Sequence, residues 1–367
     1  MTIKVDKDQA YETLLSAYRN RKQLHGITAD KITNVLTGSH KTYRYVLITA
    51  LLAKATEERI DVFSLQAQDD SDGAYDARSL CHGVIVKFER DYLAYGLGGS
   101  NEPYLNKPAR FPRIASTNAV RKGNDTIALN NLISALQQIK NKKMAYDYLC
   151  HAVYIMELNH IEYEGKFQIS QVELSDNKLI QNILDYISEL VEKSFEGEIC
   201  PIVVSAIESL FLGDKYKVIP HKVNESGASS KEVGDIDILN QENELVFSIE
   251  VKDKIFNKED VEHAISKFYE ADVKRSFFIY GKRIIPTDRV DINQLLGRFG
   301  RIGYYCCLIN IFDYAKLRLS TISDLELSTF VELLLYYAKI INATNETVEW
   351  IKQVAKTLYD GRSYQTP

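Results

Sequence analysis

The stretch GDIDILNQENELVFSIEVK, from Gly234 to Lys252, constrains the fold more strongly than any other part of the chain. Acidic and aliphatic residues alternate in Gly234–Leu239, and a second apolar run follows in Glu244–Val251. Such segments, bounded by turn-forming residues, are typical of strands. Asn240–Asn243 lies between them and favours a turn. We therefore predict a hairpin of two strands within a larger sheet.

The acids of this hairpin are spaced so that they share a face. Asp235 and Asp237 are two residues apart, as are Glu250 and Lys252, and side chains at that spacing point to the same side of a strand. A carboxylate among aliphatic residues is costly unless a partner or a metal neutralises it. Carboxylate oxygens suit Mg²⁺, so Asp237 and Glu250 are the predicted metal ligands.

This set of groups favours phosphodiester hydrolysis. A metal ion activates water and relieves charge on the phosphate and the leaving oxygen. Lys252 would orient the water and stabilise the developing charge.

Asp237, a gap and then Glu250-Val251-Lys252 resemble the PD-(D/E)xK nuclease motif, with Ile236 in place of the proline. The segments GDIDIL and VFSIEVK are also similar to the same region of archaeal junction resolvases. The resemblance implies that Asp237 is the metal-binding aspartate and that an acid on the preceding helix assists, for which Glu208 is the candidate. Asp235 is kept as the alternate or auxiliary ligand.

The N-terminal half carries a narrower resemblance. The segments Thr37–Ala55, GAYDARSLCHGVIVKFE (Gly73–Glu89) and LGGSNEPYLNKPARF (Leu97–Phe111) are similar to parts of SacI-type restriction endonucleases. This resemblance implies a type II enzyme that cuts both strands of DNA at a specific sequence with Mg²⁺. It also implies a homodimer on a palindromic site, and a cognate methyltransferase that acts on the same site without binding directly.

One geometric point conflicts with the choice of Asp237. With the turn centred between Gln241 and Glu242, a flat hairpin pairs Asp237 with Val246, so Glu250 would lie roughly 13 Å further along. We therefore expect a bend or bulge that brings the acids together. Asp235 would need a smaller shift than Asp237 to come close to Glu250.

The periodicity along the chain predicts an α/β (α+β) fold with a PD-(D/E)xK core, a mixed sheet and flanking helices. We expect a mainly helical DNA-recognition domain at 1–170, a catalytic domain at 171–312 and a helical extension at 313–367. The expected helices lie within 1–60 and at about 129–140, 143–158, 179–191 (with Ser175 as N-cap), 201–211, 258–271 and 313–360. The expected strands are 83–88, 216–223, 234–239, 244–251, 276–280 and 304–312.

The net charge of −5 and a pI of about 5.9 argue mildly against a nucleic-acid-binding protein. Local charge matters more, since no acid occurs from Lys107 to Lys122. Five basic residues lie there: Lys107, Arg110, Arg113, Arg121 and Lys122. They are either solvated surface or, as their loop setting favours, contacts to DNA phosphates.

Other candidates for DNA contact have structural alternatives. Arg78 either reads guanine or orders its loop by pairing with Asp76 or Asp72. Asn101 either contacts a base edge or forms a turn, and Lys41 is a weaker candidate for a phosphate contact.

The chain has no apolar run of membrane length, and its start resembles no signal peptide, so we expect a cytoplasmic protein. The five cysteines are expected to be buried thiols. Two rival functions remain at this stage. One is a structure-specific repair or junction nuclease of the same fold, and the other is a non-catalytic DNA-binding protein that retains the fold.

Overall fold

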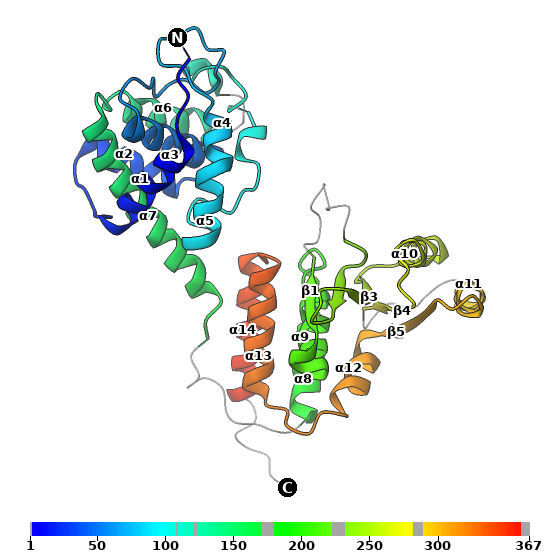
Figure 1. The fold of residues 1–367 in the computed structure, drawn as a ribbon. Helices are drawn as coiled ribbons and strands as arrows, with labels where there is room; N and C mark the ends of the chain where they lie inside the picture. The colour runs from blue at the N-terminus through cyan, green and yellow to red at the C-terminus, as the bar shows by residue number, and fades with distance from the viewer. Residues whose placement is uncertain are drawn as a thin grey trace. The chain divides into compact units, whose positions relative to one another are not determined.

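The structure is a computed structural model that describes residues 2–107, 109–119, 123–169, 180–221, 232–281 and 289–360. The chain divides into two compact units, Met1–Gly165 and Lys166–Pro367 (Figure 1). Each unit has its own hydrophobic core. The expected domain boundary at 170 and the expected N-cap Ser175 lie outside the described residues.

The N-terminal unit is built from helices packed around α3 (Lys41–Thr56). Almost every residue of α3 from Thr42 onward is buried, as in a helix that is surrounded by others. The helices around it are α1 (Lys7–Arg19), α2 (Ile27–Thr37), α4 (Ala77–Leu80), α5 (Val86–Tyr92), α6 (Asp125–Leu136) and α7 (Lys142–Lys166).

The predicted strand at 83–88 is wrong, because this segment is helical. Helix α4 continues through a π-helical turn, Cys81–Ile85, into α5. Val84, Ile85 and Phe88 are all buried in the core that contains α3. A short apolar run fits a buried helix as well as a buried strand, so periodicity alone could not separate the two.

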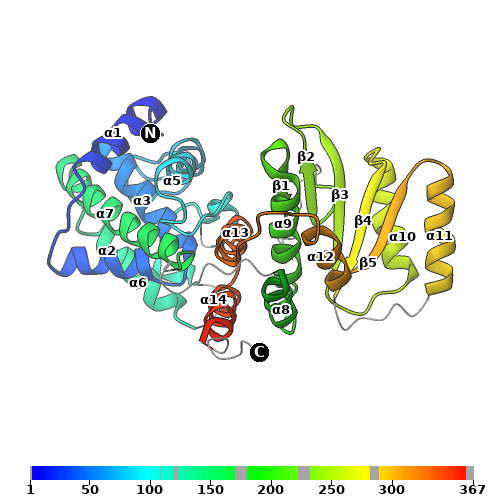
Figure 2. The ribbon, with the colours of Figure 1, turned by 90° about the horizontal axis from the view of Figure 1, so that it is seen from below.

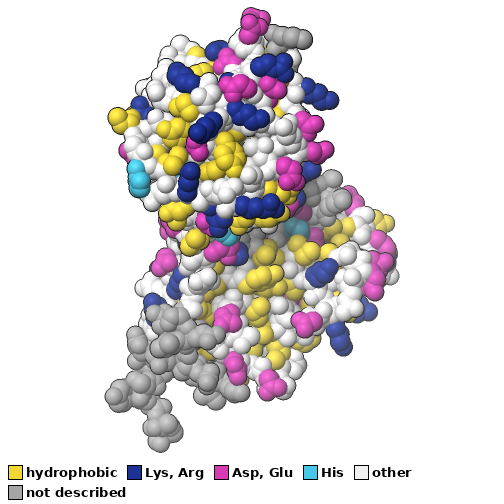
Figure 3. Space-filling model, turned by 60° about the vertical axis from the view of Figure 1, so that its left-hand side comes forward, with side chains coloured by type: hydrophobic (Ala, Val, Ile, Leu, Met, Phe, Trp, Pro, Cys, Tyr) yellow, Lys and Arg dark blue, Asp and Glu magenta, His cyan; other side chains and the backbone are white. Residues whose placement is uncertain are grey.

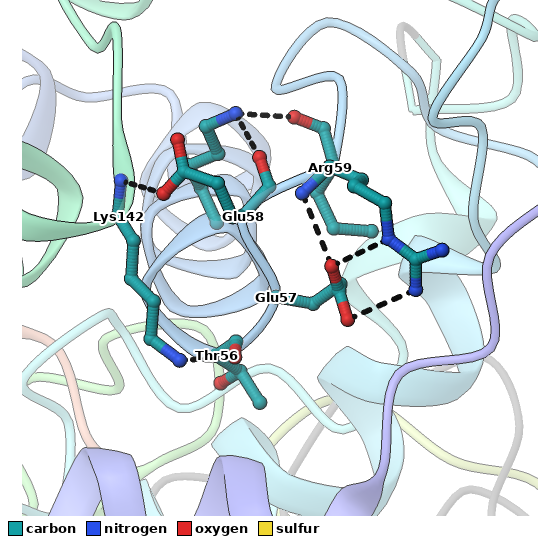
Figure 4. Close-up of polar contacts among 7 residues, drawn as sticks. Thr56, Glu57, Glu58, Arg59 and Lys142 are labelled. Atoms are coloured by element: carbon teal, nitrogen blue, oxygen red, sulfur yellow. Dashed lines mark hydrogen bonds and ion pairs between the residues drawn. The ribbon is translucent and has the colours of Figure 1, made fainter.

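Polar contacts join the end of α3 to the start of α7 (Figure 4). The backbone N–H of Lys142 donates to Glu58 Oε2 at 2.5 Å, and Lys142 Nζ donates to the carbonyl of Thr56 at 2.8 Å. Beside them, Arg59 Nε donates to Glu57 at 2.9 Å. The first of these bonds satisfies a backbone donor that the start of a helix leaves without an intrahelical partner.

The C-terminal unit contains a five-stranded mixed sheet in the order β1-β2-β3-β4-β5. Its strands are β1 (Lys217–Pro220), β2 (Ile236–Leu239), β3 (Leu245–Lys252), β4 (Arg275–Tyr280) and β5 (Tyr305–Asn310). The first three are antiparallel, and β3, β4 and β5 are parallel. The predicted mixed sheet is therefore confirmed. The chain crosses between the parallel strands through α10 (Lys258–Glu270) and α11 (Arg289–Arg301), and α11 was not predicted.

Different helices pack against the two faces of this sheet (Figure 2). On one face, Ile236, Ile249 and Ile279 share a core with α8, α9, α12, α13 and α14. On the other face, Phe278 packs with residues of α10 and α11. The bounds of the first set are α8 Ile180–Leu190, α9 Ile199–Leu212, α12 Ile311–Leu319, α13 Leu327–Ile340 and α14 Asn345–Asp360. The segment expected as a separate extension thus contributes to the core of this unit.

Two further expectations concern the whole chain. Cys81, Cys150, Cys200 and Cys306 are buried free thiols, and Cys307 is partly exposed. In the part of the chain that the structure describes, no helix is both long and apolar enough to cross a membrane.

Candidate active site

The register of β2 and β3 brings the acids closer together than a flat hairpin allows. Asp237 pairs with Ser248, and the register shifts between Ile238 and Leu239. This shift confirms the expected bulge. Glu250 is thus two residues from the partner of Asp237, a diagonal position at roughly 7–8 Å between Cα atoms. Two carboxylates at that separation can approach one cation.

Strand alternation puts these groups on the face that α10 and α11 cover. Ile236 and Ile249 belong to the core of the opposite face, so their neighbours Asp237 and Glu250 point away from that core. Glu250 also pairs with Phe278, which belongs to the core on the α10 side. Asp235 and Lys252 are two residues from these acids and share their face. We call these four residues the hairpin cluster.

Glu250 and Lys252 form an ion pair with 2.7 Å between Nζ and Oε1. Their side chains are 7% and 23% exposed, so the pair is largely shielded from water. Burial lowers the pKa of Lys252, but the negative charges of Glu250 and Asp235 outweigh it and raise this pKa above its ordinary value. Lys252 is therefore a fixed ammonium group at neutral pH.

Asp235 lies against the same pair. Its Oδ2 accepts a hydrogen bond of 2.7 Å from the backbone N–H of Val251. Burial, together with the negative charge of Glu250, raises the pKa of Asp235 to about 6. Asp235 and Glu250 therefore repel each other, and the positive charges of Lys252 and Lys267 act in the opposite direction on the pKa of Asp235.

Asp237 is held by four hydrogen bonds. Its Oδ1 accepts from Ser248 Oγ at 2.6 Å and from the backbone of Gly234 at 3.2 Å. Its Oδ2 bonds to His221 Nε2 at 2.8 Å and accepts from the backbone of Val233 at 3.2 Å. Burial raises the pKa of Asp237, but the bonds to His221 and Ser248 outweigh it, so the pKa is lowered and the carboxylate is charged.

The close approach of β2 to β3 requires a glycine at position 234. A Cβ atom there would lie 2.7 Å from the carbonyl oxygen of Ile249 and would also collide with the Ser248 hydroxyl. A backbone carbonyl cannot move away as a flexible side chain could, so only a residue without a side chain fits.

Glu208 does not join the hairpin cluster. Its carboxylate is fully buried on α9, accepts a hydrogen bond from Tyr314 and lies 2.8 Å from Arg318 Nε. The Tyr314 ring packs against Phe277, and the core that contains these rings lies on the opposite face of the sheet. The expectation that Glu208 assists the motif acids is therefore corrected, since the fold directs it to a structural ion pair on the other side.

The hairpin cluster suits a hard divalent cation by its chemistry, because it offers carboxylate oxygens and leaves a repulsion between acids. Among the described residues, no group of three or more His, Cys, Asp or Glu side chains is arranged to hold a metal ion. A cation held by Asp237 and Glu250 would take its other ligands from water, backbone oxygens or a DNA phosphate.

The candidate DNA-binding residues differ in their exposure and in the contacts that their side chains make. Lys107, Arg110 and Asn101 are exposed in loops. Arg78 lies 3.4 Å from Glu102, and Lys41 Nζ donates to the carbonyl of Gly98 at 2.8 Å.

Arg113 pairs with Asp61 and, at 3.2 Å, with Asp69, so its charge is balanced within the unit. Arg121 and Lys122 lie outside the described residues. On the face drawn in Figure 3, the basic side chains of the N-terminal unit are interspersed with acidic ones.

Sequence reasoning missed His221, since none of the histidines has ligand spacing. The position of His221 depends on the pairing of β1 with β2, which the sequence does not reveal. Ile219 pairs with Asp237, and the backbone N–H of His221 donates to the carbonyl of Asp235 at 2.8 Å, so His221 continues the same ladder. His221 and the acids thus share a face.

Both halves of the chain are similar to known protein families. Residues 8–161 match the SacI restriction endonuclease N-terminal domain, and residues 176–282 match the SacI restriction endonuclease C-terminal domain. A curated relative, the type II restriction enzyme SacI of Streptomyces achromogenes, is 42% identical over 69 residues. That segment spans 18% of this chain and 19% of the relative. With most of its length matched by the two domains in their order, the chain belongs to the SacI family of type II restriction endonucleases.

Proposed function

We propose that this protein cuts double-stranded DNA at a specific sequence, as a Mg²⁺-dependent type II endonuclease whose C-terminal unit has the PD-(D/E)xK fold. The observation that carries the proposal is the hairpin cluster, which combines two aspartates, a glutamate and a lysine on one face of two adjacent strands. The order of a helix, a hairpin, a helix and parallel strands around this cluster supports the fold assignment.

Asp237 and Glu250 are the proposed metal ligands, with Asp235 as an auxiliary acid. Asp237 is charged and fixed in orientation, as a ligand has to be. Asp235 is bonded to the Val251 backbone and is less acidic than usual, which makes it the weaker donor. When bound, Mg²⁺ would activate a water molecule and offset the charge that develops on the phosphate.

Lys252 supplies the remaining positive charge. Because its pKa is raised, it acts as an ammonium group rather than as a base. Its ion pair with Glu250 keeps it beside the proposed metal position. There it can donate hydrogen bonds to a water molecule or a phosphate oxygen and stabilise the charge that builds up during hydrolysis.

The N-terminal unit is proposed to hold and read the DNA. Lys107 and Arg110 are exposed on one loop and suit contacts to phosphate. Arg78 and Asn101 are the proposed contacts to bases, and Lys41 is a proposed contact to a DNA phosphate. Because type II sites are usually palindromic, we propose a homodimer that cuts each strand once. A separate methyltransferase would protect the same sequence.

The test is digestion of a sequenced phage genome by the purified protein with Mg²⁺, followed by mapping of the fragment ends. We expect discrete fragments whose ends share one short sequence. Lys252→Ala should lower the cleavage rate by about 10²–10³-fold, while Lys254→Ala, which alters an exposed lysine two residues away, should cut normally. Cleavage at branched structures without a common sequence would favour a junction nuclease, and no cleavage would favour a binding protein.

A further inference from the structure

His221 lies at the end of β1 and approaches the hairpin cluster from a third strand. Its backbone N–H donates to the carbonyl of Asp235, and its ring Nε2 lies 2.8 Å from Asp237 Oδ2. The side chain is 19% exposed, so the contact with Asp237 is well shielded from water. The other ring nitrogen, Nδ1, is 3.8 Å from Glu232.

The contacts of Asp237 are divided between its two oxygens. Ser248, on β3, holds Oδ1, and His221, on β1, holds Oδ2. The carboxylate is therefore bridged across three strands, and it cannot turn about its Cβ–Cγ bond without breaking one of these bonds. A carboxylate with 7% side-chain exposure has little water available to replace a lost partner.

Two observations argue that this bridge serves the site and not only the stability of the sheet. Asp237 shares a face of the hairpin with Glu250, which lies two residues from the partner of Asp237 on β3. In addition, β1 and β2 are already joined by backbone pairing over four residue pairs, so the sheet does not need a side-chain bond to align them.

We propose that His221 is a positioning residue, which fixes the carboxylate of Asp237 in the orientation that the divalent cation requires. This inference rests on the proposed function, because it takes Asp237 as a metal ligand. Groups that hydrogen-bond to metal ligands orient them, and their loss typically weakens metal binding by about 10–100-fold. His221 is thus expected to act on metal affinity, without contacting the DNA or the reacting atoms.

The test compares His221→Phe with His221→Gln. Phenylalanine keeps a ring but cannot hydrogen-bond, whereas glutamine keeps a donor on a side chain of similar reach. His263→Ala is the matched control, because His263 is exposed on α10. The affinity for Mn²⁺ is measured by calorimetry on the full chain without DNA. The Mg²⁺ concentration for half-maximal cleavage, DNA affinity without metal and the Tm are measured in parallel.

We expect His221→Phe to weaken Mn²⁺ binding by about 10–100-fold and to raise the Mg²⁺ requirement in proportion. DNA affinity should be unchanged, and His221→Gln should recover most of the metal affinity. Wild-type Mn²⁺ affinity in His221→Phe, or equal losses in the glutamine and phenylalanine variants, would overturn the inference. If the proposed function is wrong, the wild-type protein will leave DNA uncut whatever its affinity for Mn²⁺. This result differs from failure of the inference on His221, which appears only in the variants.

Discussion

Buried acids lie on both faces of the sheet in the C-terminal unit, and they are stabilised in different ways. On the α9 side, Glu208 meets the hydroxyl of Tyr314 and the guanidinium of Arg318, which lies over the ring of Phe277. On the α10 side, the hairpin cluster places three acids near one lysine. The first acid has a cation and a hydroxyl as its neighbours, whereas Asp235 in the hairpin cluster has a second acid beside it.

The difference shows that a buried carboxylate does not by itself mark an active site. Burial raises the pKa of Glu208 as it raises that of Asp235. The two acids differ in their neighbours. Glu208 faces a cation and a hydroxyl, whereas Asp235 faces a second acid. Only the second case gives a physical reason for binding a metal ion.

The largest expected effect follows from removing the central acid of the hairpin cluster. Glu250→Gln keeps the size of the side chain but removes a proposed metal ligand and the partner of Lys252. We expect cleavage to fall by more than about 10²-fold, with DNA binding retained. Rates are measured on a short duplex that carries the site. A variant that cleaves within a few-fold of wild type would remove the distinction between the two faces.

Glu208→Gln should have the opposite pattern. It removes the charge that balances Arg318 in a buried pair, so we expect the free energy of unfolding to fall by about 3 kcal/mol. Cleavage per folded molecule should stay close to wild type. Denaturant unfolding gives the stability, and the rate is measured well below the transition. Lost cleavage in a fully folded Glu208→Gln protein would place this acid in the chemistry after all.

A smaller effect is expected in the N-terminal unit, where the exposed Lys107 and Arg110 can be compared with the paired Arg113. Lys107→Ala combined with Arg110→Ala should flatten the dependence of log Kobs on log salt by roughly 2, since each lost phosphate contact changes the slope by about 0.9. Arg113→Ala should leave the slope unchanged, because its charge already pairs with Asp61 and Asp69. Equal slopes in all three proteins would exclude the loop from phosphate contact.

The strands of the C-terminal unit were predictable because their residues are β-branched, aromatic or alternating and their turns are marked by polar residues. The bulge was also expected, since no flat hairpin could bring Asp237 close to Glu250. Residues 83–88 were misassigned because the apolar run Val84–Val86 is too short to reveal its period. Helix α11 was missed, as only Ile292 and Leu295 of its residues are buried.

The site itself could be predicted only in part. Strand spacing placed Asp235, Asp237, Glu250 and Lys252 together, because a period of two fixes the face of each side chain. The partners of Asp237 depend on the alignment of β1 with β2, which joins residues far apart along the chain. The same limit applies to Glu208, whose face depends on how α9 packs.

The central claim is that a divalent cation binds between Asp237 and Glu250. Crystals of the protein grown with Mn²⁺ test it directly through the anomalous scattering of the metal. We expect a peak about 2.1 Å from a carboxylate oxygen of each residue, and we expect this peak to be lost in Glu250→Gln. A well-ordered site with no peak between these two acids, or a peak bound elsewhere in the unit, would contradict it.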